Sequence, residues 1–360
     1  MNKLLKLEAL RGFAALYVVF HHTITGNYFL GDFNLSLIFR FGQEAVILFF
    51  ILSGFVIELS FRKGKDKTFK LYFVKRFLRI FIPLIMVFLI NYILICVKDG
   101  ITPVNVYNLA GNLLMLQDVA GLKLNVVTRP FLGNMPLWSL SYEWWFYMVF
   151  FLFVTTIKKN ISLWVYIISI LCALSYMFYP FFLNRILMYL SIWWLGADLA
   201  KVYITGKPIS FGSMKTGLTA IFICTIILSF NASINQYNWS ARLNTPVSLG
   251  ISPWLEVRHF AFAFIALVIS IVWKKLKWAG FKYTLGPFKA LAKISFGIYI
   301  SYWFLILHAN YLDFIPNLIV RFFLYSIICV LFAYVIEQVL YVKINKAVMN
   351  KFYIKTGNKA

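Results

Sequence analysis

Residues 10–22 read LRGFAALYVVFHH, an apolar run with Arg11 near its start and His22 at its end. A charged or titratable side chain is costly inside a membrane helix, so it indicates a functional site or a water-filled cavity. Eleven residues of α-helix advance the chain by about 16 Å and turn it about three times. Arg11 and His22 are therefore predicted to share one helix face, one near the membrane surface and one near mid-depth. This layout suits chemistry carried out inside a membrane.

The rest of the chain also has the composition of a membrane protein. Of its 360 residues, 62% are apolar and only 13% are charged, too few to cover the surface of a soluble domain. The formal net charge of +23 could indicate a nucleic-acid partner. However, the basic residues fall in clusters between apolar blocks, as they do in the cytoplasmic loops of membrane proteins. We therefore expect a lipid bilayer as the environment and no nucleic acid as a partner.

Apolar blocks long enough to cross a bilayer core of about 30 Å recur along the chain. They predict an all-α fold, a polytopic membrane helix bundle with about ten transmembrane helices. The expected spans are residues 10–28, 37–60, 77–97, 137–157, 161–180, 184–204, 214–231, 257–273, 289–308 and 317–341. The sixth span has the weakest signal because Asp198 lies within it.

The basic residues predict a topology with both the N-terminus and the C-terminus in the cytoplasm. In this orientation most lysines and arginines lie in inner segments, the asymmetry that sets membrane topology. Of 35 such residues, the outer segments hold only Arg40, Lys98, Lys123, Arg129, Arg185, Arg242, Arg258 and Arg321. The apolar run after Lys3 and Lys6 has no small-residue cleavage site, so it is expected to remain as the first membrane helix.

The longest connection, residues 98–136, is expected outside the membrane. It contains Pro, Asn and Gly and shows no helical periodicity. Because long connections are often functional, it is a candidate cover for the outer mouth of a cavity. The four cysteines each lie alone in apolar sequence and are expected to pack there, without forming a metal site or a disulfide.

Small and polar residues inside the second and third blocks have structural interpretations that must be weighed beside functional ones. Ser53 and Gly54 interrupt an apolar helix, where small residues usually permit close helix packing. Glu44 is either interfacial or faces a cavity. Arg76 and Arg79 are three residues apart and share a helix face. Arginines at an inner interface often orient the helix or bind lipid head groups, but paired guanidinium groups also suit bidentate phosphate binding.

The fourth block opens with WSLSYEWWFY, residues 138–147. Glu143 shares a helix face with Ser139, four residues earlier. A carboxylate inside a span is expensive unless it is paired, which favours a functional role for Glu143. Trp138 and its aromatic neighbours are candidates either for this site or for an interfacial belt.

Five segments occur in the order seen in the bacterial acyltransferase family 3, which this chain resembles from about residue 6 to residue 340. They are LEALRGFAALYVVFHH (7–22), FFILSGFVI (49–57), the RxxR of KRFLRIFIP (75–83), WSLSYEWWFY (138–147) and KISFGIYISYW (293–303). The family consists of integral membrane O-acyltransferases that modify surface polysaccharides and other extracytoplasmic acceptors. The resemblance implies an acyltransferase domain over residues 1–345, followed by a cytoplasmic basic tail at 346–360.

The resemblance also implies roles for particular residues. It places the essential arginine at Arg11, the essential histidine at His22 and the family glutamate at Glu143. The cytoplasmic arginines map to Arg76 and Arg79. Trp138, Ser139 and Ser53 are the further expected substrate-binding residues, and no metal is expected.

Two positions depart from the family pattern. Relatives often have a histidine where this chain has Tyr302, and often an acidic residue where it has Ile47. These differences bear on the acceptor more than on the reaction.

The expected reaction is transfer of an acyl group, acetyl, from cytoplasmic acyl-CoA to a hydroxyl of an extracytoplasmic or lipid-linked glycan in the bacterial inner membrane. Neutral His22 would take the hydroxyl proton, since its ordinary pKa lies near physiological pH. Glu143 would orient the imidazole or the acceptor, and Arg11 would fix the donor or the helix.

Two other functions remain open at this point. The main alternative is a transporter or flippase for a glycan or a lipid-linked precursor, although no matching pair of broken half-spans supports inverted repeats. The other is a scaffold in polysaccharide assembly, which leaves His22 and Glu143 unexplained.

Overall fold

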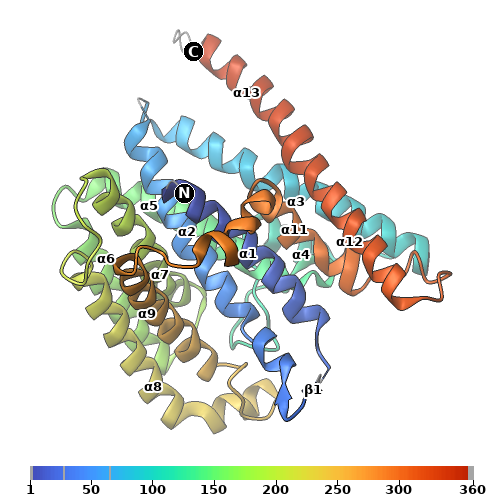
Figure 1. Cartoon of the computed structure of the whole chain (residues 1–360), viewed down its shortest axis with the longest axis horizontal. Coiled ribbons are helices and arrows are strands. Elements are labelled where there is room, and N and C mark those ends of the chain that lie inside the picture. Colours follow the sequence, from blue (N-terminus) through green and yellow to red (C-terminus); the bar gives the residue numbers. More distant parts are fainter. Residues whose placement is uncertain (1–2, 27–28, 65, 356–360) are drawn as a thin grey trace.

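The structure, a computed structural model, describes residues 3–26, 29–64 and 66–355. Its α-helices are α1 (Lys3–Thr23), α2 (Gly42–Lys63), α3 (Phe69–Asp99), α4 (Val106–Leu113), α5 (Trp138–Thr156), α6 (Ile161–Phe178), α7 (Phe182–Ile204), α8 (Lys215–Leu243), α9 (Trp254–Lys275), α10 (Phe281–Thr284), α11 (Ser295–Tyr302), α12 (Leu318–Tyr334) and α13 (Tyr341–Lys355). Figure 1 shows them as one helical assembly.

Shorter elements connect or extend these helices. Strands β1 (Phe29–Leu30) and β2 (Phe33–Asn34) form a small antiparallel hairpin. Four segments are 3-10 helices: η1 (Leu35–Phe39), η2 (Phe131–Gly133), η3 (Met135–Leu137) and η4 (Gly286–Ile294). Two are π-helical, namely η5 (Trp303–Leu307) after α11 and η6 (Val335–Leu340) between α12 and α13.

The predicted fold class, an all-α multi-pass bundle, is confirmed. Within the described residues, eight helical segments are long and apolar enough to cross a membrane. Each of them overlaps one of the predicted spans. The other two predicted spans, 10–28 and 184–204, fall on α1 and α7, which carry Arg11 and Asp198 respectively.

The centre of the bundle is the contact between α2 and α7. A Cβ added at Gly54 would lie 2.0 Å from the Trp193 carbonyl oxygen, and one added at Gly196 would lie 1.8 Å from the Ile51 carbonyl oxygen. Each glycine therefore lets the backbone of the other helix approach, as expected for small residues in a membrane bundle. The prediction of close packing at Ser53 and Gly54 is confirmed at Gly54.

The first helix is fixed against the segment that leads into α11. A Cβ at Gly12 would lie 1.9 Å from the Phe288 carbonyl oxygen of η4. The backbones of α1 and η4 therefore touch directly beside Arg11. This contact sets the position of α1 relative to η4, and α11 follows η4 without a break.

The connection 98–136 differs from its prediction, because it contains helix α4 and the turns η2 and η3. Helix α4 is short, and Asn105 caps it by accepting a hydrogen bond of 2.9 Å from the Asn108 N–H. A buried ion-pair network holds the connection to the bundle: Asp118 lies 2.9 Å from Lys123 and 3.3 Å from Arg185 of α7. Tertiary contacts of this kind stabilise a segment whose own periodicity is weak.

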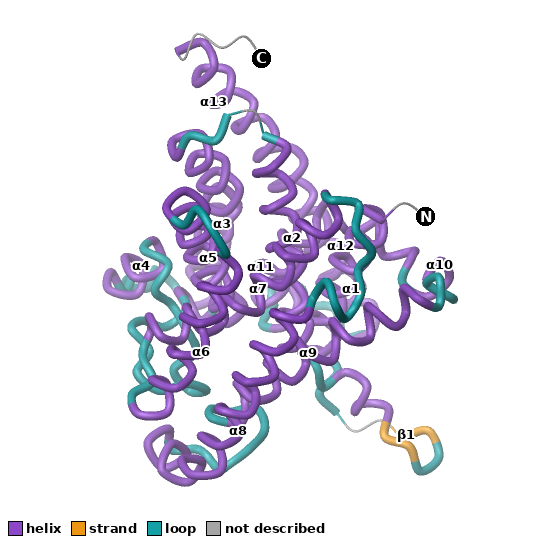
Figure 2. Tube along the Cα trace, turned by 90° about the vertical axis from the view of Figure 1, so that its left-hand side faces the viewer, coloured by secondary structure: helices purple, strands orange, loops and turns teal. Residues whose placement is uncertain are grey.

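Several helices extend beyond their predicted spans, most of all at two C-terminal ends. Helix α8 runs to Leu243, although the span was expected to end at residue 231. The last span continues through η6 into α13, so the described part of the 346–360 tail is helical to Lys355, and 356–360 lie outside the described residues. In both overall views the N-terminal end of α1 and the C-terminal end of α13 lie away from the β1–β2 hairpin (Figures 1 and 2).

Candidate active site

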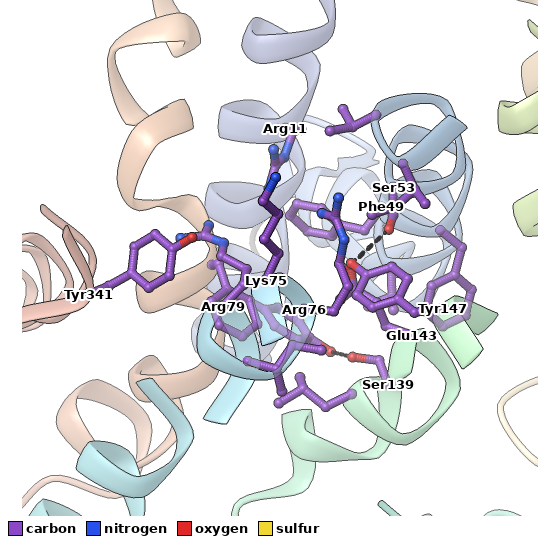
Figure 3. Close-up of a pocket in the computed structure, with 18 of the residues that line it drawn as sticks. Arg11, Phe49, Ser53, Lys75, Arg76, Arg79, Ser139, Glu143, Tyr147 and Tyr341 are labelled. Atoms are coloured by element: carbon purple, nitrogen blue, oxygen red, sulfur yellow. Dashed lines mark hydrogen bonds between the residues drawn. The ribbon is translucent and has the colours of Figure 1, made fainter. Parts of the chain in front are cut away.

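Two hollows lie at different levels of α1. The first, here called the inner cavity, has a volume of about 360 Å³. Its polar and charged lining consists of Arg11, Ser53, Lys75, Arg76, Arg79, Ser139, Glu143, Tyr147, Tyr299, Tyr341 and Asn345. Figure 3 shows the labelled side chains among them converging from α1, α2, α3, α5 and α13. The inner cavity thus collects most of the site residues predicted from sequence.

One wall of the inner cavity is a hydrogen-bonded group around Glu143. Ser53 Oγ donates to Glu143 Oε1 over 2.8 Å, and the Tyr147 hydroxyl donates to the same oxygen. Trp193 Nε1 donates to Ser53 over 3.3 Å from α7. The carboxylate is therefore held by neutral donors, and its nearest polar partners come from α2 and α5.

The inner cavity also holds cationic side chains, and its arginines differ in their partners. Arg79 is paired with Glu337 of η6, with 2.6 Å between Nη2 and Oε2, and it lies over the rings of Phe296 and Tyr341. Arg76 donates to Ser60 Oγ over 3.0 Å, and its buried Nε has no hydrogen-bond partner in the described chain. Arg11 forms no ion pair with any residue that the structure describes. Arg11 and Arg76 are thus the cavity arginines that have no ion-pair partner among the described residues.

The second hollow, here called the outer cleft, has a volume of about 670 Å³. It is lined by His21, His22, Ile24, Thr25, Ser36, Phe39, Arg40, Trp303, Leu307 and His308. The two adjacent histidines are held differently. His21 Nδ1 lies 2.6 Å from the Phe39 carbonyl oxygen, and its ring fills the space above Gly42. His22 Nδ1 lies 3.0 Å from the Val18 carbonyl oxygen, one turn earlier in α1.

The contact with Val18 defines the form of the neutral His22 ring. A carbonyl oxygen only accepts hydrogen bonds, so Nδ1 must carry the proton in this contact. In the neutral imidazole the lone pair then lies on Nε2, at the far edge of the ring. His22 therefore presents an unprotonated nitrogen that can accept a proton.

Helix α11 contacts both the inner cavity and His22 of the outer cleft. Tyr299 lines the inner cavity and shares a hydrogen bond of 2.9 Å with Ser139 Oγ. Tyr302, three residues later, lies 3.1 Å from His22 Nδ1. Arg11 and His22 thus line different hollows, and α11 reaches the first through Tyr299 and contacts His22 through Tyr302. Glu143 lies on the Arg11 side, bonded to Ser53 and Tyr147 rather than to the His22 imidazole.

The structure also shows which predicted residues lie elsewhere. Trp138 lines neither hollow; it packs beneath the Lys123 ammonium, 4.0 Å from the ring centroid, and stacks on His259. Glu44 is buried and paired with Arg258 of α9, so it is neither free at the interface nor part of the inner cavity.

Sequence reasoning missed Tyr147 and Glu337. Tyr147 follows Glu143 by four residues, a spacing that places both on one helix face. Glu337 lies inside the apolar span 317–341, so the rule that drew attention to Glu143 also applies to it. Both signals were therefore present in the sequence.

Comparison with known proteins identifies the family of the chain. No curated protein sequence and no solved structure matches the chain. Residues 4–338 match a family model described as an acyltransferase domain. The match covers nearly the whole chain and includes both hollows, apart from the C-terminal lining residues of the inner cavity. The chain therefore belongs to acyltransferase family 3, and the protein is a membrane acyltransferase.

Proposed function

We propose that the protein is a membrane O-acyltransferase of the bacterial inner membrane that moves an acyl group, acetyl, from cytoplasmic acyl-CoA to a hydroxyl of an extracytoplasmic or lipid-linked glycan. The observation that carries the proposal is the charge of the inner cavity. Four cationic side chains line it against one carboxylate, and two of its arginines have no ion-pair partner in the described chain. Such a cavity suits a polyanionic donor.

The donor is assigned to the inner cavity because coenzyme A carries phosphates and cannot cross the bilayer freely. Arg76 and Lys75 lie in the second turn of α3, close to the basic loop that the predicted topology puts in the cytoplasm. Arginine binds phosphate through paired N–H groups, and lysine binds it as a point charge. Arg79, already paired with Glu337, shapes the cavity wall and does not bind phosphate.

The acceptor is assigned to the outer cleft because His22 lines it. His22 Nε2 takes the proton of the acceptor hydroxyl while the hydroxyl oxygen attacks the thioester carbonyl carbon. The carbon–sulfur bond then breaks, and the proton passes to the departing thiolate of coenzyme A. A base placed in this way typically contributes a factor of about 10² to 10⁴ in rate.

The thioester must reach His22 through the region of α11. Arg11 lies on the same helix as His22 but opens into the inner cavity, so it is placed to hold the donor along α1. Glu143 lines the same cavity with its hydrogen-bond partners Ser53 and Tyr147. Ser139 lies deeper in the cavity, where Tyr299 holds its hydroxyl.

Mass spectrometry of surface glycans tests the proposal directly. Glycans should be compared from cells with the gene, from cells without it and from cells carrying His22→Ala. The expected result is one acyl group per modified sugar in the first sample only. If cells without the gene have less glycan on their surface but each glycan keeps the same mass, the result would contradict acyl transfer and favour a transporter.

A further inference from the structure

The side chain of Tyr302 is buried between α1 and the α11 helix that carries it. Its exposed fraction is 0%, and its hydroxyl lies 3.1 Å from His22 Nδ1. The Tyr302 and His22 rings are 5.6 Å apart between centroids, and the Trp303 and His22 rings are 5.3 Å apart. The imidazole is therefore enclosed by two consecutive aromatic residues of one helix end.

The direction of the hydrogen bond follows from the Val18 contact. Because Nδ1 carries its proton toward the Val18 carbonyl oxygen, the Tyr302 oxygen can only share that proton as a second acceptor. Both contacts then favour the same tautomer, the one with its lone pair on Nε2. Without Tyr302, only a backbone carbonyl on the helix of His22 itself would fix the imidazole.

The backbone around this contact is also fixed. Gly12 lets α1 touch the Phe288 carbonyl oxygen of η4, and a Cβ at Gly297 would lie 2.9 Å from Ala333 of α12. Helix α11 is thus held between α1 and α12. The position of the Tyr302 hydroxyl relative to the imidazole is set by the packing of three segments, which is what a positioning residue requires.

We propose that Tyr302 is a positioning residue for His22: its hydroxyl oxygen holds Nδ1–H and so keeps Nε2 free to take the proton of the acceptor. This inference rests on the proposed function, in which His22 is the base. Position 302 is also where this chain departs from the pattern that its sequence resembles. An imidazole at that position could accept the same hydrogen bond through an unprotonated nitrogen, so Tyr302→His is the conservative replacement.

The test is steady-state acyl transfer by purified full-length protein, with acetyl-CoA as donor and glycan from the gene-deletion strain as acceptor. The variants are Tyr302→Phe, Tyr302→His, Tyr302→Leu and His22→Ala. Tyr311→Phe is the matched control, because it removes another tyrosine hydroxyl, one that donates to the Leu305 carbonyl oxygen over 2.8 Å and lines neither hollow. The melting temperature of each variant reports its folding.

Tyr302→Phe should lower kcat by about 3- to 10-fold, the range that one hydrogen bond between neutral groups contributes. The KM for acetyl-CoA should change by less than about twofold, because Tyr302 does not line the inner cavity. Tyr302→His should recover most of kcat, and Tyr311→Phe should behave as the parent. Tyr302→Leu, which also lacks the acceptor, should lose at least as much kcat as Tyr302→Phe.

Two results would overturn the inference in different ways. If His22→Ala is inactive while Tyr302→Phe keeps the kcat of the parent, His22 is the base and Tyr302 does not position it. If His22→Ala remains active, the assignment of the base fails, and the role of Tyr302 fails with it. A Tyr302→His variant as impaired as Tyr302→Phe at an unchanged melting temperature would also contradict the hydrogen-bond role.

Discussion

Arg79 and Glu337 form an ion pair across the inner cavity wall, with 2.6 Å between Nη2 and Oε2. Glu337 lies in the π-helical turn η6, and its other oxygen accepts a hydrogen bond from the Gly297 N–H. One carboxylate therefore joins α3, α11 and the last membrane helix. Of the two arginines that the sequence presents as a pair, Arg79 is used for this junction and Arg76 is left for an anionic ligand.

Replacing Arg76 and replacing Arg79 should therefore have different effects. Arg76→Gln should raise the KM for acyl-CoA by about tenfold or more and change kcat little, because it removes a contact present in both the bound ground state and the transition state. Arg79→Gln should mainly destabilise the protein, because it leaves Glu337 charged and buried without its partner, a loss of about 3–5 kcal/mol for a buried pair. Donor titrations and thermal unfolding in detergent measure the two effects.

The double variant Arg79→Gln with Glu337→Gln serves as the control. It removes both charges and should recover much of the stability that Arg79→Gln loses. A large rise in donor KM for Arg79→Gln, with its stability unchanged, would show that both arginines bind phosphate.

The glycine contact between α2 and α7 should tolerate no added methyl group. Gly54→Ala and Gly196→Ala each place a Cβ within 2.0 Å of a backbone oxygen on the facing helix, so the two helices must move apart. We expect loss of folded protein in fluorescence-detected size-exclusion chromatography. Gly121→Ala is the matched control, since a Cβ there meets nothing within 4 Å. Normal yields for both α2–α7 variants would mean that this packing is looser than described.

The buried network of the outer connection should make stability depend on pH. Burial alone would raise the pKa of the Asp118 carboxyl, but the charges of Lys123 and Arg185 hold that pKa below its ordinary value. A carboxyl whose pKa is lower in the folded chain stabilises the fold above its unfolded pKa, about 3.9, and this contribution is lost as pH falls through the folded value.

The melting temperature of the parent should therefore drop as the pH is lowered from neutrality to below about 3.9, where the Asp118 carboxyl of the folded chain begins to take up its proton. Asp118→Asn should begin at a lower melting temperature and lose less of it on acidification. If parent and variant share one pH profile, titration of Asp118 does not contribute to stability.

The topology prediction is tested by reporter fusions. Fusions after Lys70 and Lys346 should both report the cytoplasm, and a fusion near Asn125 should report the extracytoplasmic side. The reason is that most basic residues lie in the segments predicted to face the cytoplasm. An extracytoplasmic reading at Lys346 would overturn the even number of spans.

The fold class could be predicted because each apolar block has the length of a bilayer crossing, a property that depends on local sequence alone. Helix ends were less predictable. Helix α8 continues twelve residues past its apolar block, to Leu243, because nothing in residues 232–243 stops a helix once the membrane span has begun it. The segment 106–113 has too few residues to show a period, and its capping by Asn105 and burial by tertiary contacts decide its structure.

The candidate site could be predicted in its residues but less well in its arrangement. Helical spacing correctly joins Ser139 and Glu143 in one cavity. It also places Arg11 and His22 on one face, but it does not reveal that these two residues line different hollows. That division depends on how α11 packs against α1, a contact between residues nearly 300 positions apart. The pairing of Arg79 with Glu337 was hidden for the same reason.

The central claim is that His22, and not the adjacent His21, takes the proton of the acceptor. Nδ1 of each imidazole faces a carbonyl oxygen, of Phe39 for His21 and of Val18 for His22, but the His21 ring packs against Gly42, whereas His22 also meets the Tyr302 hydroxyl of α11. The most direct measurement is transfer of labelled acetyl from acetyl-CoA to glycan by purified His22→Ala and His21→Ala proteins that unfold at the temperature of the parent. His22→Ala should show no transfer above background, and His21→Ala should keep substantial activity. Activity in His22→Ala together with its loss in His21→Ala would contradict the account.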